Sequence, residues 1–488
     1  MKPPYIYRPL ATGHIRLFGL NVPPDCPLNT LQTFELSEAP AYYALSYTWG
    51  SRKRTRPLEV DGWVLSVGLN LYAAIRRLRG SSFEEDSAPV KWLWIDKICI
   101  NQDDMSERST QIQNVDTISN IRRSRSHWRL DALSIATSIK CHATDQRDKV
   151  YGLLGLAAEN QDLSRVPDAL RADYGLTIEQ VYIRVALFFI REYKSLSILT
   201  RASGISSDVS RAQRKYKLDF LPTWVPNWCD FTVTEKHTAK SLSWLSHPNY
   251  ENATTTLCFL EHYNASLGRF AELVEPLNES LLRLRGIKVD TVDKTTPFNS
   301  CGRSCEDSLL QFLEIALQFL PRNRDRNTLT DWIASWIKAT TAEQYHLGGN
   351  TAQQILSDGS AFLFNNLRSY KHIPLCFMPQ NNIGEIMDLL RELSTGGNPE
   401  SYISLATNFC FNRNFIITLG GRMGIAPQAT RREDLVFVIF GGGVPYIIRK
   451  QRGDSLFVGE SYIDGLMRGE AVYAWQRGEM ENEILELR

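Results

Sequence analysis

Asp96 is the residue whose position most suggests chemistry. It directly follows the apolar run Trp92–Ile95, a pattern that predicts a strand buried on both faces of a parallel sheet. In open parallel sheets, ligands bind beyond the carboxyl ends of strands, where a carboxylate can hold a ribose hydroxyl or orient a loop. The alternative is that Asp96 caps its own loop by accepting backbone N–H groups between Cys99 and Gln102. The residue types alone favour this capping role.

Glu107 is a second carboxylate close to this loop in the sequence. Asp104 and Glu107 have the spacing of a helix start, and Ile112, Val115 and Ile118 then repeat every three residues, so we expect a helix here. A carboxylate on a helix can act as a general base. Near the helix start it equally complements the helix dipole. Glu107 is therefore a candidate catalytic residue with a structural role as the competing interpretation.

Familiar catalytic and metal-binding patterns are missing from the sequence. It contains no GxSxG, HExxH, GxxxxGK[ST] or GxGxxG motif. Cys301 and Cys305 form a C-x3-C pair without a second pair at zinc-ligand spacing. The glycines at 441–443 lie between two β-prone runs, where a tight hairpin is the simpler explanation. We expect no metal site and no cofactor.

The composition excludes several classes of protein. The 488 residues include 55 Lys+Arg and 54 Asp+Glu, so the net charge of +1 gives no global attraction to nucleic acid. Basic clusters at 52–56 and 122–125 lack interleaved aromatics and indicate solvated loops. Apolar runs reach about six residues, against the roughly 18 needed for a membrane span. With no export signal at the amino terminus and nine scattered cysteines, we expect a cytoplasmic protein.

The first 158 residues predict an α/β layer. A strand at 43–48, a helix with Leu71, Ile75 and Leu78 on one face, and the strand Trp92–Ile95 imply a βαβ unit. The pattern breaks at about Ser119, because the following segment SNIRRSRSHWR is basic and aperiodic where a third strand should follow. We expect a first domain at 1–158 that is interrupted near 119–142.

The rest of the chain divides into two further regions. Residues 159–405 form a mixed, mainly helical middle region, which includes an amphipathic helix at 177–192 that begins with the capping box Thr177/Gln180. It also contains the proline-aromatic turn 221–228 and an alternating strand at 281–292. Residues 406–488 predict an antiparallel β-meander of four strands.

The strings YYALSYTWG at 42–50 and WLWIDKICINQDDMSER at 92–108, followed by Gln111, resemble the fungal heterokaryon incompatibility (HET) domain. The family pattern is Y-x-A-L-S-Y-x-W-G, then W-I-D-x-I-C-I-N-Q and E-R-x-x-Q. The blocks at 143–156, 173–182, 221–228 and 421–471 are also typical of HET-domain proteins. The likeness therefore covers most of the chain, and the middle is its loosest part.

The resemblance implies a TIR-like α/β fold, here with an incomplete parallel sheet. It also implies a role in non-self recognition and programmed cell death, with other proteins of the incompatibility system as partners. Some TIR relatives cleave NAD with a glutamate on a later helix, which carries over only as analogy. The shared motif residues of the domain are Tyr47, Trp49, Gly50, Asp96, Asn101, Gln102, Glu107 and Arg108.

One segment departs from the family pattern. Family members usually carry a V-x-W-L-G strand and a W-x-x-R-x-W-x-x-Q-E segment where this chain has only 119–142. The missing Q-E is the counterpart of the region that bears the TIR glutamate, so the resemblance implies that this chain lacks that acid. A true internal deletion would expose strand edges around Trp92–Ile95. A mis-spliced gene model explains the abrupt break better, and transcripts across the codons for Ile118 to Arg129 would distinguish the two.

Three hypotheses of function follow. The first is a binding and signalling module of the incompatibility system. The second is a TIR-like NAD-cleaving hydrolase with NAD as substrate, Asp96 near the ligand and Glu107 as the acid, for which nicotinamide release lost in Glu107→Gln is the test. The third is an inactive degenerate copy or a mis-spliced product, which predicts no growth defect on overproduction in a fungal host.

Overall fold

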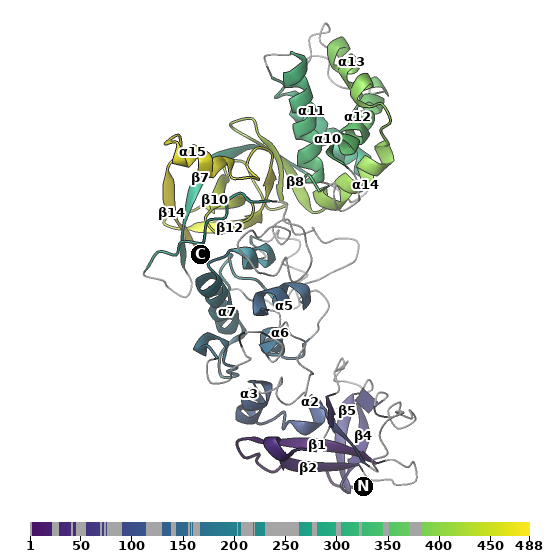
Figure 1. Ribbon diagram of the computed structural model, residues 1–488, viewed down its shortest axis with the longest axis vertical. Coiled ribbons are helices and arrows are strands. Elements are labelled where there is room, and N and C mark those ends of the chain that lie inside the picture. Colours follow the sequence, from purple (N-terminus) through teal and green to yellow (C-terminus); the bar gives the residue numbers. More distant parts are fainter. Residues whose placement is uncertain are drawn as a thin grey trace. The chain divides into compact units, whose positions relative to one another are not determined.

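The computed structural model describes the chain in two compact units, Met1–Val181 and Tyr182–Arg488 (Figure 1). The residues that the structure describes are 2–21, 29–40, 42–44, 55–68, 71–72, 75, 90–113, 129–137, 143–154, 157, 159, 166–202, 204–205, 218, 220–229, 263–275, 281–298, 304–321, 325–344, 351–369 and 383–488. All structural statements below concern these residues.

The described residues of the first unit form a four-stranded mixed sheet in the order β2-β1-β6-β3. Its strands are β1 (His14–Asn21), β2 (Thr30–Glu35), β3 (Tyr42–Ala44) and β6 (Val90–Trp94). β3 and β6 are parallel and adjacent, with Tyr43 opposite Leu93. The structure therefore contains the strand and the parallel pair that the βαβ pattern predicts.

The prediction of a parallel sheet is wrong for the other two strands. β1 is antiparallel to β2 and to β6. Antiparallel neighbours need only a short connection, whereas parallel ones need a crossover of a dozen or more residues, and only eight residues separate β1 from β2. β6 has β1 on one edge and β3 on the other, so the exposed edges that a true internal deletion would leave at this strand are not seen.

A β-hairpin that the sequence analysis did not predict follows β3. Its strands, β4 (Thr55–Val60) and β5 (Trp63–Gly68), pair antiparallel across a two-residue turn. The turn residues Asp61 and Gly62 have φ of 50° and 82°, the left-handed backbone that an Asp-Gly hairpin turn requires. Asp61 also accepts a hydrogen bond from the backbone of Leu31 at 2.8 Å, which ties the hairpin to β2.

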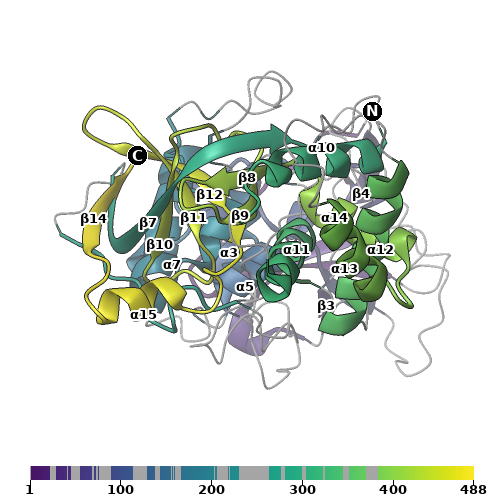
Figure 2. The ribbon, with the colours of Figure 1, turned by 90° about the horizontal axis from the view of Figure 1, so that it is seen from above.

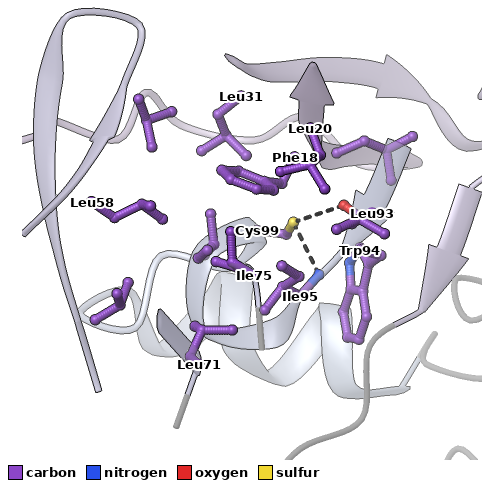
Figure 3. Packing of buried hydrophobic residues seen from close by; sticks show 14 of the residues in the cluster. Phe18, Leu20, Leu31, Leu58, Leu71, Ile75, Leu93, Trp94, Ile95 and Cys99 are labelled. Carbon is purple, nitrogen blue, oxygen red and sulfur yellow. Dashed lines mark hydrogen bonds between the residues drawn. The ribbon is translucent and has the colours of Figure 1, made fainter. Parts of the chain in front are cut away.

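The core of the first unit packs between the sheet, the hairpin and the helical segment that contains Leu71 and Ile75 (Figure 3). Leu71 and Ile75 are buried as their spacing predicts, while Leu78 lies outside the described residues. The Cys99 thiol accepts a hydrogen bond from Ile95 and donates to the carbonyl of Leu93. Burial raises the pKa of Cys99 to about 12, so the thiol is protonated and part of the core.

Short helices complete this unit. They are η1 (Leu36–Glu38), α2 (Asp96–Cys99), α3 (Met105–Gln113), α5 (Leu130–Thr137), α6 (Asp148–Tyr151) and η4 (Asp168–Leu170). The longer α7 (Ile178–Tyr193) crosses the boundary of the units. Thr177 and Gln180 form the predicted capping box, since each backbone N–H donates to the other side chain.

The second unit is built on a closed β-barrel. Its strands are β7 (Leu282–Pro297), β8 (Arg413–Thr418), β9 (Met423–Pro427), β10 (Leu435–Ile439), β11 (Tyr446–Lys450), β12 (Ser455–Glu460), β13 (Tyr462–Ile463) and β14 (Asn482–Leu487). The circuit β7-β10-β11-β12-β14 closes because β7 pairs with both β10 and β14. The carboxyl-terminal half of β7 pairs with β8, β8 pairs with β9, and β9 pairs with β13.

The predicted antiparallel β-meander is confirmed for β10, β11 and β12, which pair antiparallel in sequence order, and is wrong for β8. β8 and β10 are consecutive among the four predicted strands, but the long β7 pairs with both of them. β12 and β14 are parallel. Strand positions follow from local sequence, whereas this order depends on β7, which lies more than 110 residues before β8.

In the described residues between β7 and β8, five helices are inserted (Figure 2). They are α10 (Cys305–Leu317), α11 (Arg326–Thr341), α12 (Ala352–Ser369), α13 (Ile383–Leu393) and α14 (Pro399–Cys410). Trp336 stacks on Phe362 and contacts Tyr402 in the core of this helical insert. η5 (Ser197–Arg201) and α15 (Glu470–Gln476) complete the unit. In the described part of the chain, no helix combines the length and apolar character needed to cross a membrane.

Candidate functional site

Glu107 lies at the start of α3 and forms a buried ion pair with Arg16 of β1. Arg16 Nη1 lies 2.5 Å from Glu107 Oε1, and Nη2 lies 3.0 Å from Oε2. The two side chains are 4% and 5% exposed. The backbone N–H of Asn101 donates to Oε1 at 2.7 Å. Both carboxylate oxygens are therefore engaged, in the geometry that arginine and carboxylate favour.

Arg16 is a site residue that the sequence analysis missed. Its guanidinium also donates to the carbonyls of Cys99 at 3.1 Å and Arg8 at 2.6 Å, and it lies 5.2 Å from the centre of the Tyr7 ring. These contacts fix the loop after α2 against β1. A lone arginine within a short strand is usually solvent-exposed, so the sequence carries no local signal for this burial.

The loop after Asp96 is held by both backbone and side-chain groups. Asp96 Oδ1 accepts from the backbone of Lys97 at 2.7 Å. The main-chain carbonyl of Asp96 accepts from the backbone of Ile100 at 3.3 Å and from the side chain of Gln102 at 2.8 Å. Asn101 Oδ1 accepts from the backbone of Asp103 at 3.2 Å. The main-chain carbonyl of Asp96 therefore takes part in closing this loop.

Arg108 points to a different part of the first unit. Its Nη2 lies 3.0 Å and 3.3 Å from the carboxylate oxygens of Asp148, and its guanidinium lies 4.0 Å from the centre of the Tyr174 ring. Arg147 lies 5.1 Å from the same ring and binds Asp145 at 2.8 Å and 3.0 Å. The Tyr174 hydroxyl donates to Asp148. Two arginines, two aspartates and one tyrosine therefore form one cluster.

The protonation of this cluster follows from its burial. Burial and the neighbouring Asp148 raise the pKa of Tyr174, so its hydroxyl stays a neutral donor. Burial also raises the pKa of Asp148, although Tyr174 and Arg108 oppose that shift. Burial acts in the same direction on Asp145, but hydrogen bonds from Arg147 outweigh it and lower its pKa. Asp145 is accordingly ionised at neutral pH.

Gln111 adds a third connection from α3, because its side-chain amide donates to the carbonyl of His14 at 3.0 Å. Glu107 and Gln111 therefore bind β1, while Arg108 binds the segments that contain Asp148 and Tyr174. We call this set the α3 hub. Its members are Arg16, Glu107, Arg108, Gln111, Asp145, Arg147, Asp148 and Tyr174.

The α3 hub joins residues that are distant in the sequence and neutralises its own charges. Its chemistry suits positioning of chain segments. Of the predicted site residues, the structure brings Asp96, Asn101, Gln102, Glu107 and Arg108 together around the start of α3. Tyr47, Trp49 and Gly50 lie outside the described residues. In the described regions, no group of three or more His, Cys, Asp or Glu side chains is arranged to hold a metal ion.

Two family models match the chain. The heterokaryon incompatibility protein (HET) model matches residues 42–123, which include β3, β6, α2 and α3. The Het-6 beta-barrel domain model matches residues 388–480, which include β8 to β13. The chain therefore contains a HET domain and a Het-6-type barrel domain. The HET match ends at Arg123, close to the break in the sequence pattern at Ser119.

The chain is also similar to Heterokaryon incompatibility protein 6, OR allele, of Neurospora crassa. The two are 29% identical over 216 residues, which cover 41% of this chain and 30% of the relative. The chain thus matches less than a third of that relative's length. No solved structure matches the chain significantly.

Proposed function

We propose that this chain is a heterokaryon incompatibility protein that acts in non-self recognition and cell-death signalling in a fungus. The observation that carries the proposal is the presence of the HET domain and the Het-6-type barrel on one chain. The name of the Neurospora crassa relative also refers to heterokaryon incompatibility. The partial overlap with that relative makes the activity of the whole protein our inference.

We infer a binding and signalling role. The support is the α3 hub, in which Arg16 and the backbone of Asn101 occupy both oxygens of Glu107. A general base needs a free oxygen within reach of the proton it removes. A TIR-like NAD hydrolase remains the alternative, and no observation favours it. A TIR-like fold for the HET domain is also part of the proposal, supported by the parallel β3–β6 pair with helical residues between the strands.

The cellular setting is part of the same proposal. We infer that the partners are other proteins of the incompatibility system, that the protein works in the cytoplasm, and that it needs no cofactor. The near-zero net charge supports protein partners over nucleic acid, because it provides no long-range attraction to phosphates.

Expression in a fungal host tests the function. The full chain is produced in one of two otherwise compatible Neurospora crassa strains, and growth of the fused hyphae is compared with an empty-vector pair. We expect slower growth and more dead compartments in the fused cells that contain the chain. Equal growth of the two pairs, with the protein shown to accumulate, would support an inactive copy and reject the proposal.

A further inference from the structure

The end of helix α11 has an unusual backbone. α11 ends at Thr341, and the next two residues, Ala342 and Glu343, have φ of 48° and 52°. Helices often end with one left-handed residue, which is usually glycine because a side chain adds a steric cost. Within the described ranges, Ala342 and Glu343 are the one consecutive pair of non-glycine residues with positive φ. Such a conformation persists only where the surrounding structure determines it.

The first contacts that hold this turn come from the segment that contains Tyr263. The Tyr263 hydroxyl donates to the carbonyl of Ala342, and the side-chain amide of Gln344 donates to the Tyr263 oxygen at 2.5 Å. Tyr263 and Ala342 are fully buried. Burial raises the pKa of Tyr263, so the hydroxyl proton is always available to the carbonyl.

The second set of contacts comes from the segment after β12. Arg468 forms an ion pair with Glu343 at 3.1 Å. Asp464 lies 4.0 Å from Lys338, which is in the last turn of α11. The Arg468–Glu343 pair holds the turn itself, and the Asp464–Lys338 pair holds the helix end that precedes it.

The two holding segments are also bound to each other. The ring of Tyr462 lies 5.8 Å from the ring of Tyr263. The backbone N–H of Asn264 donates to the carbonyl of Met467 at 2.8 Å. Residues 263–264 and 462–468 are therefore joined to each other, and together they contact the end of α11. This junction lies where the helical insert meets the barrel, since α11 packs against β9.

We propose that residues 263–264 and 462–468 form a conformational latch on the end of α11. The closed latch keeps Ala342 and Glu343 in the left-handed conformation. When its contacts break, the turn relaxes and the end of α11 changes conformation. The latch thereby couples the barrel to the helical insert, and this inference does not depend on the proposed function.

Hydrogen exchange of the full chain, measured by mass spectrometry, tests the latch. Tyr263→Phe keeps the ring and removes the hydroxyl contacts to Ala342 and Gln344. We expect the amides of residues 338–344 to exchange about tenfold faster than in the unmodified protein, while β10 and β11 are unchanged. An increase below about twofold at residues 338–344 would overturn the latch.

A second substitution tests the strain. Added to Tyr263→Phe, Ala342→Gly should return the exchange rates to within about twofold of the unmodified protein, because glycine adopts positive φ without steric cost. The matched control is Ala339→Gly, also buried but within the helix, which should not restore protection. Failure of Ala342→Gly to restore protection, or equal recovery with Ala339→Gly, would reject strain at this turn.

A surface variant keeps the test valid if Tyr263→Phe does not fold. Arg468→Gln breaks the pair with Glu343, and its side chain is 55% exposed, so the fold should tolerate it. We expect exchange at residues 338–344 to rise about threefold or more. Arg477→Gln, at an arginine 60% exposed, is the matched control and should leave that segment unchanged. Equal exchange in the two variants would overturn the latch.

Discussion

Arg16 of β1 and Glu107 of α3 are 91 residues apart in the sequence and form a buried, two-point ion pair. Glu107 belongs to the E-R-x-x-Q motif of the HET family, and its partner lies outside the segment matched by the family model. The motif carboxylate is therefore bound to a strand that precedes the recognisable part of the domain. This pair is the structural centre of the α3 hub.

Breaking the pair should destabilise the first unit strongly. We expect Arg16→Met or Glu107→Gln to cost about 3–5 kcal/mol, because each leaves a buried partner without its counter-charge. The double variant should cost clearly less than the sum of the two. The measurement is the free energy of opening of β1 amides, obtained from hydrogen exchange over a range of urea concentrations.

An exposed pair supplies the control. Arg171 and Asp168 form an ion pair whose side chains are 58% and 93% exposed. Arg171→Met should change the stability by about 0–1 kcal/mol. A cost for Arg16→Met as small as that for Arg171→Met, or strict additivity of Arg16→Met and Glu107→Gln, would contradict the role of the buried pair.

The sequence predicted the elements that have a local signal. The apolar run at β6, the capping box at Thr177 and the alternating residues of β7 each follow from neighbouring residues. The Asp61-Gly62 turn also has a local signal, although our predictions did not include it. Strand pairing has no such local signal, because the strands with which β7 pairs to close the barrel lie more than 130 residues away in the sequence.

The candidate site was predictable to the same extent. Motif resemblance identified Glu107 and Arg108, but their roles depend on Arg16, Asp148 and Tyr174, which the chain folding brings to them. A buried arginine and an exposed one look alike in sequence. Only the structure therefore shows which charged residues, distant in the sequence, contact each other.

Glu107 should not support cleavage of NAD. We expect purified protein incubated with NAD to release no nicotinamide above the buffer rate, measured by chromatography. Any release should be equal in Glu107→Gln and in the unmodified protein. Arg16→Met is the matched control, since it breaks the same ion pair and keeps the carboxylate. Release that Arg16→Met retains and Glu107→Gln abolishes would identify Glu107 as catalytic.

Glu159 should make the region around α5 sensitive to pH. Its carboxylate accepts two hydrogen-bond contacts from the backbone of Leu130, at 3.0 Å and 3.2 Å. Burial raises its pKa from 4.5 to about 7, and Asp131 adds to the shift while Arg129 opposes it. The folded state therefore holds this proton more tightly than the unfolded state. Stability should fall as the pH rises from about 4.5 to 7, by on the order of 3 kcal/mol.

Two glutamine variants check this pH dependence. Glu159→Gln should remove most of the loss of protection in α5 between pH 5 and pH 8, as measured by hydrogen exchange corrected for the intrinsic rate at each pH. Glu35→Gln, at an exposed carboxylate of the same unit, should leave the profile unchanged. A profile for Glu159→Gln that superimposes on that of the unmodified protein would show that another group controls α5.

Replacing two helix glycines of the insert by alanine should change its stability in opposite directions. A Cβ at Gly359 of α12 would lie 2.6 Å from Ile337 Cδ1, whereas a Cβ at Gly384 of α13 meets nothing within 4 Å. We expect Gly359→Ala to destabilise the insert by about 1–3 kcal/mol through overpacking. Gly384→Ala should stabilise it by up to about 1 kcal/mol through helix propensity. Thermal unfolding measures both changes in stability, and a change of the same sign in the two variants would contradict the packing described for these glycines.

The central claim is that the chain acts in heterokaryon incompatibility and that the α3 hub positions the domain for it. Growth of fused Neurospora crassa hyphae tests this most directly, with Arg108→Gln compared with Arg171→Gln at equal protein levels. Arg108 binds Asp148 and stacks on Tyr174, whereas Arg171 is an exposed arginine. We predict that Arg171→Gln retains the growth defect and that Arg108→Gln loses it. A full defect with Arg108→Gln, or none with the unmodified chain, would contradict the account.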